Sequence, residues 1–262
     1  MCLLVVAWLS HPRYRLVVAG NRDEFHDRPA APLGWWNDVP GTLAGRDLRA
    51  GGTWLGLSRP GRVGLLTNFR EAEPAAPRGT PEAAPSRGRL VPEFLAGNTS
   101  PAGFLEALHG RASAFAGFNL LVGDRSGLHY YSNVGSAPPR NLPPGVYGLS
   151  NHRLDEPWPK LMRTRERFAA ELRADEPAAD ALFGLLGDAT PAEPPPVTGD
   201  GLPPDLERAL SAPFVRHDHY GTRCSTVVLV AHDGGTVVHE RRFDAAGAQT
   251  GATRIAFREA AA

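Results

Sequence analysis

The chain has 262 residues, of which 42% are hydrophobic, so it is long enough to bury a substantial core as a single domain. Its 28 basic and 28 acidic residues give a formal net charge of +0 and form no basic stripe, which excludes nucleic acid as the main partner. Two cysteines are too few for a disulfide framework, so we expect free thiols.

The start of the chain predicts a β-hairpin. Residues 1–10 are apolar, but no cationic stretch precedes them, no cleavage site follows, and they are too short to span a bilayer. We therefore expect a buried strand in a cytoplasmic protein without a membrane span. The β-branched run 14–20 predicts the partner strand, which ends at Asn21.

A second hairpin follows. Residues 52–58 and 62–69 flank the turn signal Arg59-Pro60-Gly61, which places Asn68 near the end of a strand. The segment Glu71 to Gly88 is rich in Pro, Ala, Arg and Gly and has no periodicity. We expect it to be a long surface loop or flap that could cover a site.

The rest of the chain alternates between helices and strands. Helical patterns cover residues 90–96, 101–112, 157–174, 177–186 and 206–212. Strand patterns cover residues 117–123, 128–132, 146–151, 222–231, 236–243 and 253–257. On the longest helix, Leu161, Phe168 and Leu172 share one face. This order predicts an α+β fold of antiparallel sheets covered by helices, with residues 1–262 as a single domain.

Cys2 gains special chemistry if the initiator methionine is removed, which is usual when the second residue is small. The residue then carries a thiol and an α-amine with a pKa of roughly 7.7 to 8.0, so it supplies both a nucleophile and a base. The alternative interpretation is that Cys2 is a small buried hydrophobe in a strand.

The segment Asn21-Arg22-Asp23-Glu24 follows the strand that pairs with the one starting at Cys2. In a tight antiparallel pair, the end of the second strand lies beside the start of the first. A carboxylate there could hold the α-ammonium, and an arginine could lower the thiol pKa or orient a substrate carboxylate. We therefore expect Asn21, Arg22 and Glu24 to contact substrate. The alternative is an exposed charged turn.

Several motifs resemble those of one known family. They are Met1-Cys2, Ala19-Gly20-Asn21-Arg22-Asp23-Glu24-Phe25, Arg28-Pro29, Gly51-Gly52-Thr53-Trp54-Leu55-Gly56, Leu66-Thr67-Asn68, Gly117-Phe118-Asn119-Leu120, Tyr147-Gly148-Leu149-Ser150-Asn151, Pro157-Trp158-Pro159-Lys160-Leu161 and Tyr220-Gly221-Thr222-Arg223. On these the chain is identified as a member of the NRDE family, also called the Transport and Golgi organization 2 family. Its eukaryotic members are linked to Golgi organisation and mitochondrial metabolism, and some have been proposed as haem-trafficking factors.

The sequence is also distantly similar to the choloylglycine hydrolase and penicillin V acylase group of N-terminal nucleophile (Ntn) hydrolases. That resemblance implies a four-layer αββα sandwich and cleavage of a small amide or related acyl bond, with no cofactor required. It implies that Cys2 attacks the carbonyl, Asp23 positions the amine, Asn68 and Asn151 donate to the oxyanion, and Arg223 balances charge. Such donors are typically worth about 3 kcal/mol each.

The sequence departs from the acylases at one position. Gly20 stands where their arginine precedes the asparagine, and Arg22 instead follows Asn21. Alternation along a strand then predicts that Arg22 faces away from Cys2. By the same alternation, an Arg223 that points into the site would place Cys224 in the opposite layer as a buried structural thiol.

A second hypothesis is a non-catalytic carrier on the same fold that binds haem or another apolar acid. The nine histidines show no metal-ligand spacing, and His217-x-His219 is more typical of a polar loop than of a metal site. Under either hypothesis the partner is a small molecule.

Overall fold

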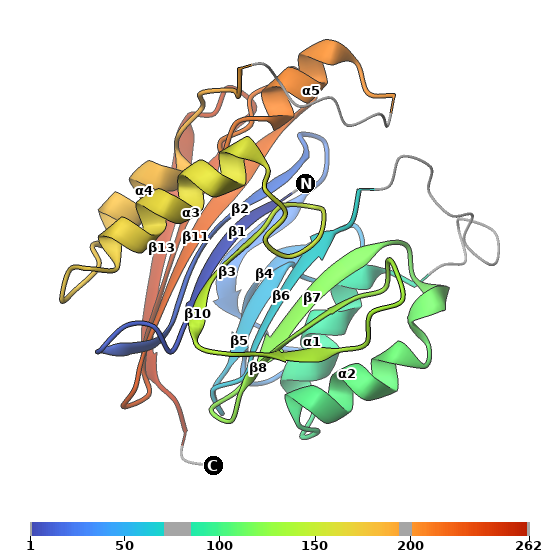
Figure 1. Cartoon of the computed structure of the whole chain (residues 1–262), viewed down its shortest axis with the longest axis vertical. Coiled ribbons are helices and arrows are strands. Elements are labelled where there is room, and N and C mark those ends of the chain that lie inside the picture. Colours follow the sequence, from blue (N-terminus) through green and yellow to red (C-terminus); the bar gives the residue numbers. More distant parts are fainter. Residues whose placement is uncertain (1, 71–84, 194–200, 261–262) are drawn as a thin grey trace. The chain divides into compact units, whose positions relative to one another are not determined.

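The computed structural model describes residues 2–70, 85–193 and 201–260. The chain divides into two compact units, the first made of Met1–Arg28 and Pro144–Phe257 and the second of Pro29–Pro143 and Arg258–Ala262. Each unit contains one antiparallel sheet with helices against it (Figure 1). The predicted α+β class with antiparallel sheets is therefore confirmed, whereas the single domain stays a prediction.

The sheet of the first unit has six strands in the order β10-β1-β2-β11-β12-β13. Their bounds are β1 Cys2–Trp8, β2 Tyr14–Phe25, β10 Gly145–Leu149, β11 Tyr220–Ala231, β12 Gly235–Phe243 and β13 Gln249–Arg258. The hairpin partners β1 and β2 lie in the middle of this sheet, so β2 is hydrogen-bonded on both sides. Because β2 has a partner strand on each side, its strand conformation continues through Asn21-Arg22-Asp23-Glu24. We had expected this segment to follow the strand.

Helices α3 (Pro159–Glu171) and α4 (Ala179–Leu186) cover one face of this sheet (Figure 1). The core beneath them contains alternate residues of the central strands, including Leu3, Val5, Val17, Ala19, Val227 and Leu229. From α3, the predicted face of Leu161, Phe168 and Leu172 packs into this core, which confirms it. The short helix α5 (Pro204–Leu210) contributes to a smaller cluster with Val215 and Tyr220.

The sheet of the second unit is a seven-stranded meander in chain order. Its strands are β3 Ala30–Trp35, β4 Thr42–Asp47, β5 Leu55–Ser58, β6 Val63–Asn68, β7 Phe118–Gly123, β8 Leu128–Ser132 and β9 Arg140–Leu142. Helices α1 (Leu90–Ala96) and α2 (Pro101–His109) and the 3₁₀ turns Arg87–Arg89 and Ala112–Ala114 complete the unit. The hydroxyl of Ser100 caps α2 by accepting from the Gly103 amide at 3.2 Å.

The sequence did not predict three strands of this unit, β3, β4 and β9. The Glu71 to Gly88 loop, for which we expected a covering role, lies largely outside the described residues. The other predicted helices and strands are present with small shifts at their ends.

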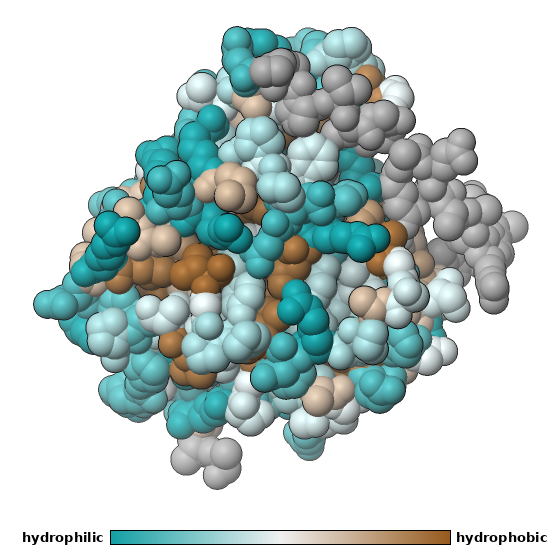
Figure 2. All heavy atoms as spheres, viewed as in Figure 1, coloured by the Kyte–Doolittle hydropathy of each residue, from teal (hydrophilic) through white to brown (hydrophobic). Residues whose placement is uncertain are grey.

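The exposed surface carries few large apolar side chains. Among the described residues these are Leu9, Phe25, Leu48 and Met162. On the face shown in Figure 2, hydrophobic residues occur as separate groups among hydrophilic ones. None of the helices in the described part of the chain has the length and hydropathy that a membrane crossing needs. The cytoplasmic location stays a prediction.

Candidate active site

The candidate site forms where the start of β1 meets the end of β2. Cys2 lies directly opposite Arg22, and Leu3 lies opposite Asn21. Directly opposed residues of an antiparallel pair point to the same side of the sheet. Arg22 therefore shares the face of Cys2, and the expectation that it faces away is wrong. Which residues of β2 share the face of Cys2 depends on the register between the two strands, and this register cannot be read from the sequence pattern of β2 alone.

Asn151 holds the main-chain nitrogen of Cys2. The Cys2 N–H donates to Asn151 Oδ1 at 2.7 Å. Asn151 is buried, two residues after the end of β10, with a φ of 57°. Asparagine tolerates this left-handed conformation better than most residues do, because its short amide bonds locally. Cys2 and Asn151 are thus in contact through the amide oxygen, and the role of Asn151 as an oxyanion donor stays a prediction.

The surroundings of Cys2 favour its protonated thiol. Burial raises the pKa of this thiol, and the negative charge of Asp23 adds to the rise. The positive charges of the chain terminus and of Arg22 act in the opposite direction, as does a main-chain hydrogen bond from Asp23. Because the net pKa is raised, a base is needed to form the nucleophilic thiolate.

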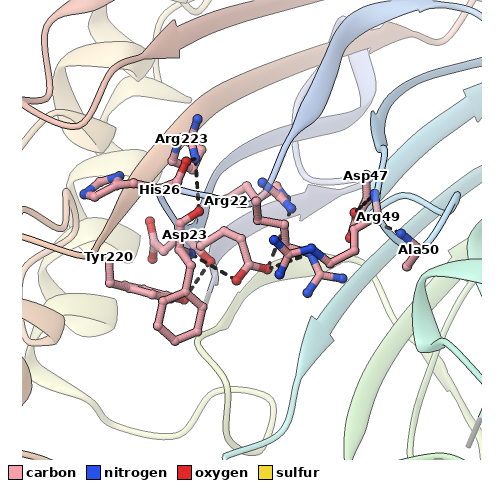
Figure 3. A network of polar contacts seen from close by, with 11 residues as sticks. Arg22, Asp23, His26, Asp47, Arg49, Ala50, Tyr220 and Arg223 are labelled. Carbon is pink, nitrogen blue, oxygen red and sulfur yellow. Dashed lines mark hydrogen bonds and ion pairs between the residues drawn. The ribbon is translucent and has the colours of Figure 1, made fainter. Parts of the chain in front are cut away.

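Asp23 is a buried carboxyl held by β11. Its Oδ1 accepts from Thr222 Oγ1 at 2.7 Å. Its main-chain carbonyl accepts from the Tyr220 hydroxyl at 2.6 Å (Figure 3). The Thr222 oxygen in turn accepts from the Val215 amide at 2.9 Å. These bonds fix the carboxyl at the end of β2.

The ionisation of Asp23 is a balance between burial and nearby cations. Burial raises the pKa of the Asp23 carboxyl. The positive charges of the chain terminus, Lys160 and Arg22 lower it, as does the hydrogen bond from Thr222. The net direction is upward, so the surroundings favour the neutral carboxyl more than water does.

Asn21 lies on the opposite face from Cys2, beside the helices. Its Nδ2 donates to the carbonyls of Leu186 and Pro213, both at 2.9 Å, and its Oδ1 accepts from Ser225 Oγ at 2.6 Å. These bonds join β2 to the end of α4 and to the segment before β11. The predicted contact of Asn21 with substrate stays a prediction, and the structure shows a bridging role for its amide.

Arg22 and Glu24 form an ion-pair chain. Arg22 Nη2 lies 3.7 Å from Glu24 Oε2, which is also 3.7 Å from Arg28 Nε. The guanidinium of Arg22 is buried, so its charge is poorly screened on the face of Cys2. Both residues thus lie near the candidate nucleophile, and their contact with substrate stays a prediction.

Arg223 lies at a bulge in β11, where the pairing with β2 shifts between Thr222 and Cys224. Its Nη1 donates to the main-chain carbonyls of Phe25 at 3.0 Å and His26 at 2.8 Å (Figure 3). The guanidinium therefore fastens the chain that leaves β2. Its predicted charge-balancing role at Cys2 stays a prediction.

Cys224 is a buried free thiol, as predicted. It pairs with Arg22, which pairs with Cys2, so the two cysteines lie in one row on the same face of three neighbouring strands. The expected placement of Cys224 in the opposite layer is wrong because the bulge at Arg223 resets the alternation of β11. Burial raises the pKa of the Cys224 thiol well above its ordinary value, which makes it inert.

Asn68 ends β6 in the second unit, as predicted, and its side chain is exposed. Its role as an oxyanion donor stays a prediction. Among residues 2–70, 85–193 and 201–260 there is no group of three or more His, Cys, Asp or Glu side chains that could hold a metal ion.

The sequence did not identify Lys160 as a site residue. This lysine lies in the first turn of α3 and is buried, and its Nζ donates to the Leu210 carbonyl at 2.6 Å. It belongs to the motif Pro157-Trp158-Pro159-Lys160-Leu161, which was noted for its family resemblance alone. A lysine at a helix start usually lies in solvent, so only tertiary packing reveals its burial.

A solved structure shares this fold. The chain is similar to the Caenorhabditis elegans ortholog of N-acylethanolamine-hydrolyzing acid amidase, with a TM-score of 0.51 and 10% identity, covering 87% of this chain and 92% of that one. It also matches the mutant C2A conjugated bile acid hydrolase from Clostridium perfringens, with a TM-score of 0.46 and 9% identity over 97% and 92% of the two chains. The first likeness places the chain in the Ntn-hydrolase fold class and confirms that prediction.

Sequence comparison defines the family more narrowly. The profile described as Transport and Golgi organisation 2 matches residues 1–245. The Transport and Golgi organization protein 2 homologs of Bos taurus and Homo sapiens are 35% and 33% identical to the chain over 262 residues, with 92% of each chain covered. The chain therefore belongs to the Transport and Golgi organisation 2 family, as its motifs predicted.

Proposed function

We propose that this protein is an Ntn-type cysteine hydrolase that cleaves a small amide or related acyl bond, with Cys2 as the nucleophile. The proposal requires cleavage of the peptide bond before Cys2, which turns the Cys2 nitrogen into an α-amine. The observation that carries it is the 2.7 Å hydrogen bond from the Cys2 nitrogen to Asn151 Oδ1, in a half-buried residue whose thiol feels the charges of Asp23 and Arg22. This arrangement fixes a potential base and a potential nucleophile in one residue.

In the proposed reaction, the Cys2 thiol attacks the carbonyl carbon while its proton passes to the neutral α-amine. The amine then gives this proton to the leaving nitrogen, so that the C–N bond breaks and a thioester forms on Cys2. Water attacks the thioester, with the same amine as base, and releases the acid. The thiol is restored.

Each neighbour has a distinct proposed role. Asn151 orients the α-amine through its amide oxygen, and ionised Asp23 stabilises the ammonium form of that amine. Arg22 offers a positive charge on the same face as the thiol, where it can stabilise the thiolate or a substrate carboxylate. These roles favour a small anionic or polar acyl substrate.

The test is a hydrolysis screen over a mixture of small N-acyl compounds, followed by mass spectrometry, with wild type and Cys2→Ser compared at equal concentration. We expect the wild type to consume at least one compound, and the variant to lose about a thousandfold or more of that rate. Cys224→Ser is the matched control, because it changes the other cysteine in the same row, and its rate should stay close to wild type. Equal rates for wild type and Cys2→Ser would refute the proposal.

The carrier hypothesis predicts a different outcome for the same proteins. A carrier of haem or another apolar acid would show no turnover and a saturable Soret shift that Cys2→Ser largely preserves. A titration with haem, with an unrelated protein of similar size as reference, distinguishes the two. A shift no larger than the reference would exclude the haem carrier.

A further inference from the structure

Lys160 is a buried cation at a place that disfavours cations. It is 5% exposed, and it lies in the first turn of α3, where the helix dipole is positive. A buried ammonium is costly unless it is hydrogen-bonded and paired with negative charge. The Leu210 carbonyl supplies one hydrogen bond, at 2.6 Å, but carries no full charge.

The positive charge of Lys160 acts on the carboxyl of Asp23. Burial, the largest effect, raises the pKa of Asp23, and the cations that lower it are the chain terminus, then Lys160, then Arg22. The titratable groups around this carboxyl also include the thiols of Cys2 and Cys224, whose pKa values both respond to the charge of Asp23. Lys160 and Arg22 are thus the side-chain cations that lower the pKa of Asp23.

The position of Lys160 is built by several elements of the first unit. Its ammonium fastens α3 to the last residue of α5 through Leu210. The segment after Leu210 is held to β2, because the side chain of Asn21 donates to the Pro213 carbonyl. It is also linked to Asp23, because the Val215 amide donates to the Thr222 hydroxyl, which donates to the Asp23 carboxyl. The lysine and Asp23 thus belong to one bonded framework.

The proposed hydrolysis gives this lysine a particular task. Removal of Met1 also removes the terminal amine that lowers the pKa of Asp23 in the present chain, and the new α-amine of Cys2 must be neutral to accept the thiol proton. Burial would at that moment favour protonation of Asp23, and a neutral carboxyl could not stabilise the ammonium that forms next. A permanent cation elsewhere is needed to keep Asp23 ionised throughout the cycle.

We propose that Lys160 is that cation, and therefore a positioning residue that acts on the α-amine of Cys2 through Asp23. This inference rests on the proposed function. It assigns a role to the Trp158-Pro159-Lys160 segment, in which Pro159 begins α3 and places the lysine in its first turn. Substrate does not contact Lys160.

The experiment measures the carboxyl titration of Asp23 by carbon-13 NMR on aspartate-labelled protein, with the Asp23 signal assigned from its loss in Asp23→Asn. Lys160→Gln keeps a donor for the Leu210 carbonyl and removes the charge. We expect its Asp23 pKa to rise by about one unit or more, the shift typical of losing a nearby opposite charge. Lys160→Arg should restore a value near wild type.

Arg163→Gln is the matched control, since it removes a cation from the same helix that pairs with Asp188 at 3.2 Å instead. Its Asp23 pKa should match wild type. An unchanged Asp23 pKa in Lys160→Gln would overturn the inference, as would an equal rise in Arg163→Gln. If Lys160→Gln does not fold, the Lys160→Met and Lys160→Arg pair gives the same comparison.

The titration does not depend on turnover, so its outcome is separate from that of the proposed function. Where the screen yields a substrate, the acid limb of the kcat–pH profile should move to higher pH in Lys160→Gln, with little change in KM. In an Asp23→Asn background, Lys160→Gln should add almost nothing to the loss of rate. A full further loss in that background would contradict action through Asp23.

Discussion

At the scale of single residues, the site depends on which side chains the strand register brings to one face. Cys2, Arg22 and Cys224 form a row across β1, β2 and β11, whereas Asn21 points to the helices. In this row the thiol of Cys2 has the guanidinium of Arg22 as a neighbour, whereas the thiol of Cys224 is inert. A change of one residue in register would exchange these faces and remove the cation from Cys2.

Asp23→Asn is expected to retain or raise stability at neutral pH while the proposed activity falls. The pKa of Asp23 is raised in the folded state, so its contribution to stability is fully present below the ordinary carboxyl pKa and is lost as the pH rises through the folded value. Asparagine does not titrate, and its Oδ1 can still accept from Thr222. The Tm of the variant relative to wild type should therefore increase as the pH rises from the ordinary carboxyl pKa of about 4 to the folded value.

Calorimetry of both proteins across this pH range checks the expectation. Asp188→Asn is the reference variant, because its effect on stability should have the opposite pH dependence. The pKa of Asp188 is lowered by a hydrogen bond from Thr190 and by Arg163 and Arg167, although burial opposes this. Its removal should cost more stability at neutral pH than at acid pH. A relative Tm of Asp23→Asn that decreases with rising pH would contradict the account.

Much of the candidate site could be predicted from the sequence, because Cys2, Asp23 and Asn151 are marked by motifs in a fixed order. The faces of Arg22 and Cys224 could not be predicted, because they depend on the pairing of Cys2 with Arg22 and on the bulge at Arg223. Lys160 could not be predicted either, since its burial results from the packing of α3 beside the segment that follows α5.

At the scale of elements, α3 is fitted closely onto β10. A Cβ atom at Gly148 would lie 2.8 Å from Leu161 Cδ1 and 2.9 Å from its Cγ. Gly148→Ala should therefore force the two elements apart, at a cost of about 1 to 3 kcal/mol in unfolding free energy. Urea denaturation measures this.

Gly184→Ala in α4 is the matched substitution, because nothing lies within 4 Å of the added atom. Alanine favours a helix over glycine by about 1 kcal/mol, so this variant should be more stable than wild type. Equal effects of the two substitutions would contradict the close fit between α3 and β10.

The missed strands show why edges are hard to predict. β3 contains Pro32 and a register shift between Ala31 and Gly34, and it forms one edge of its sheet, where proline is tolerated. β9 forms the other edge and has only three residues. In β4, Gly45 lies against the Trp54 ring, so a small residue interrupts the apolar pattern. In the other sheet, β1, β2 and β11 have apolar runs with adjacent β-branched residues and were predicted.

At the scale of the whole molecule, the structure defines the fold class and does not define the chemistry. A structural likeness at 10% identity shows the fold of an amidase without transferring its substrate, and one fold can host unrelated activities. The names of the family relatives refer to transport and Golgi organisation and describe no reaction. The chemistry at Cys2 therefore has to be measured on this chain.

The most direct measurement is the mass of the N-terminal peptide after the protein is mixed with a substrate from the screen and quenched in acid. The account predicts a peptide that begins at Cys2 and carries the acyl group of the substrate as a thioester, which hydroxylamine removes. A peptide that retains residues before Cys2 and carries no acyl group, while substrate is consumed, would contradict the account.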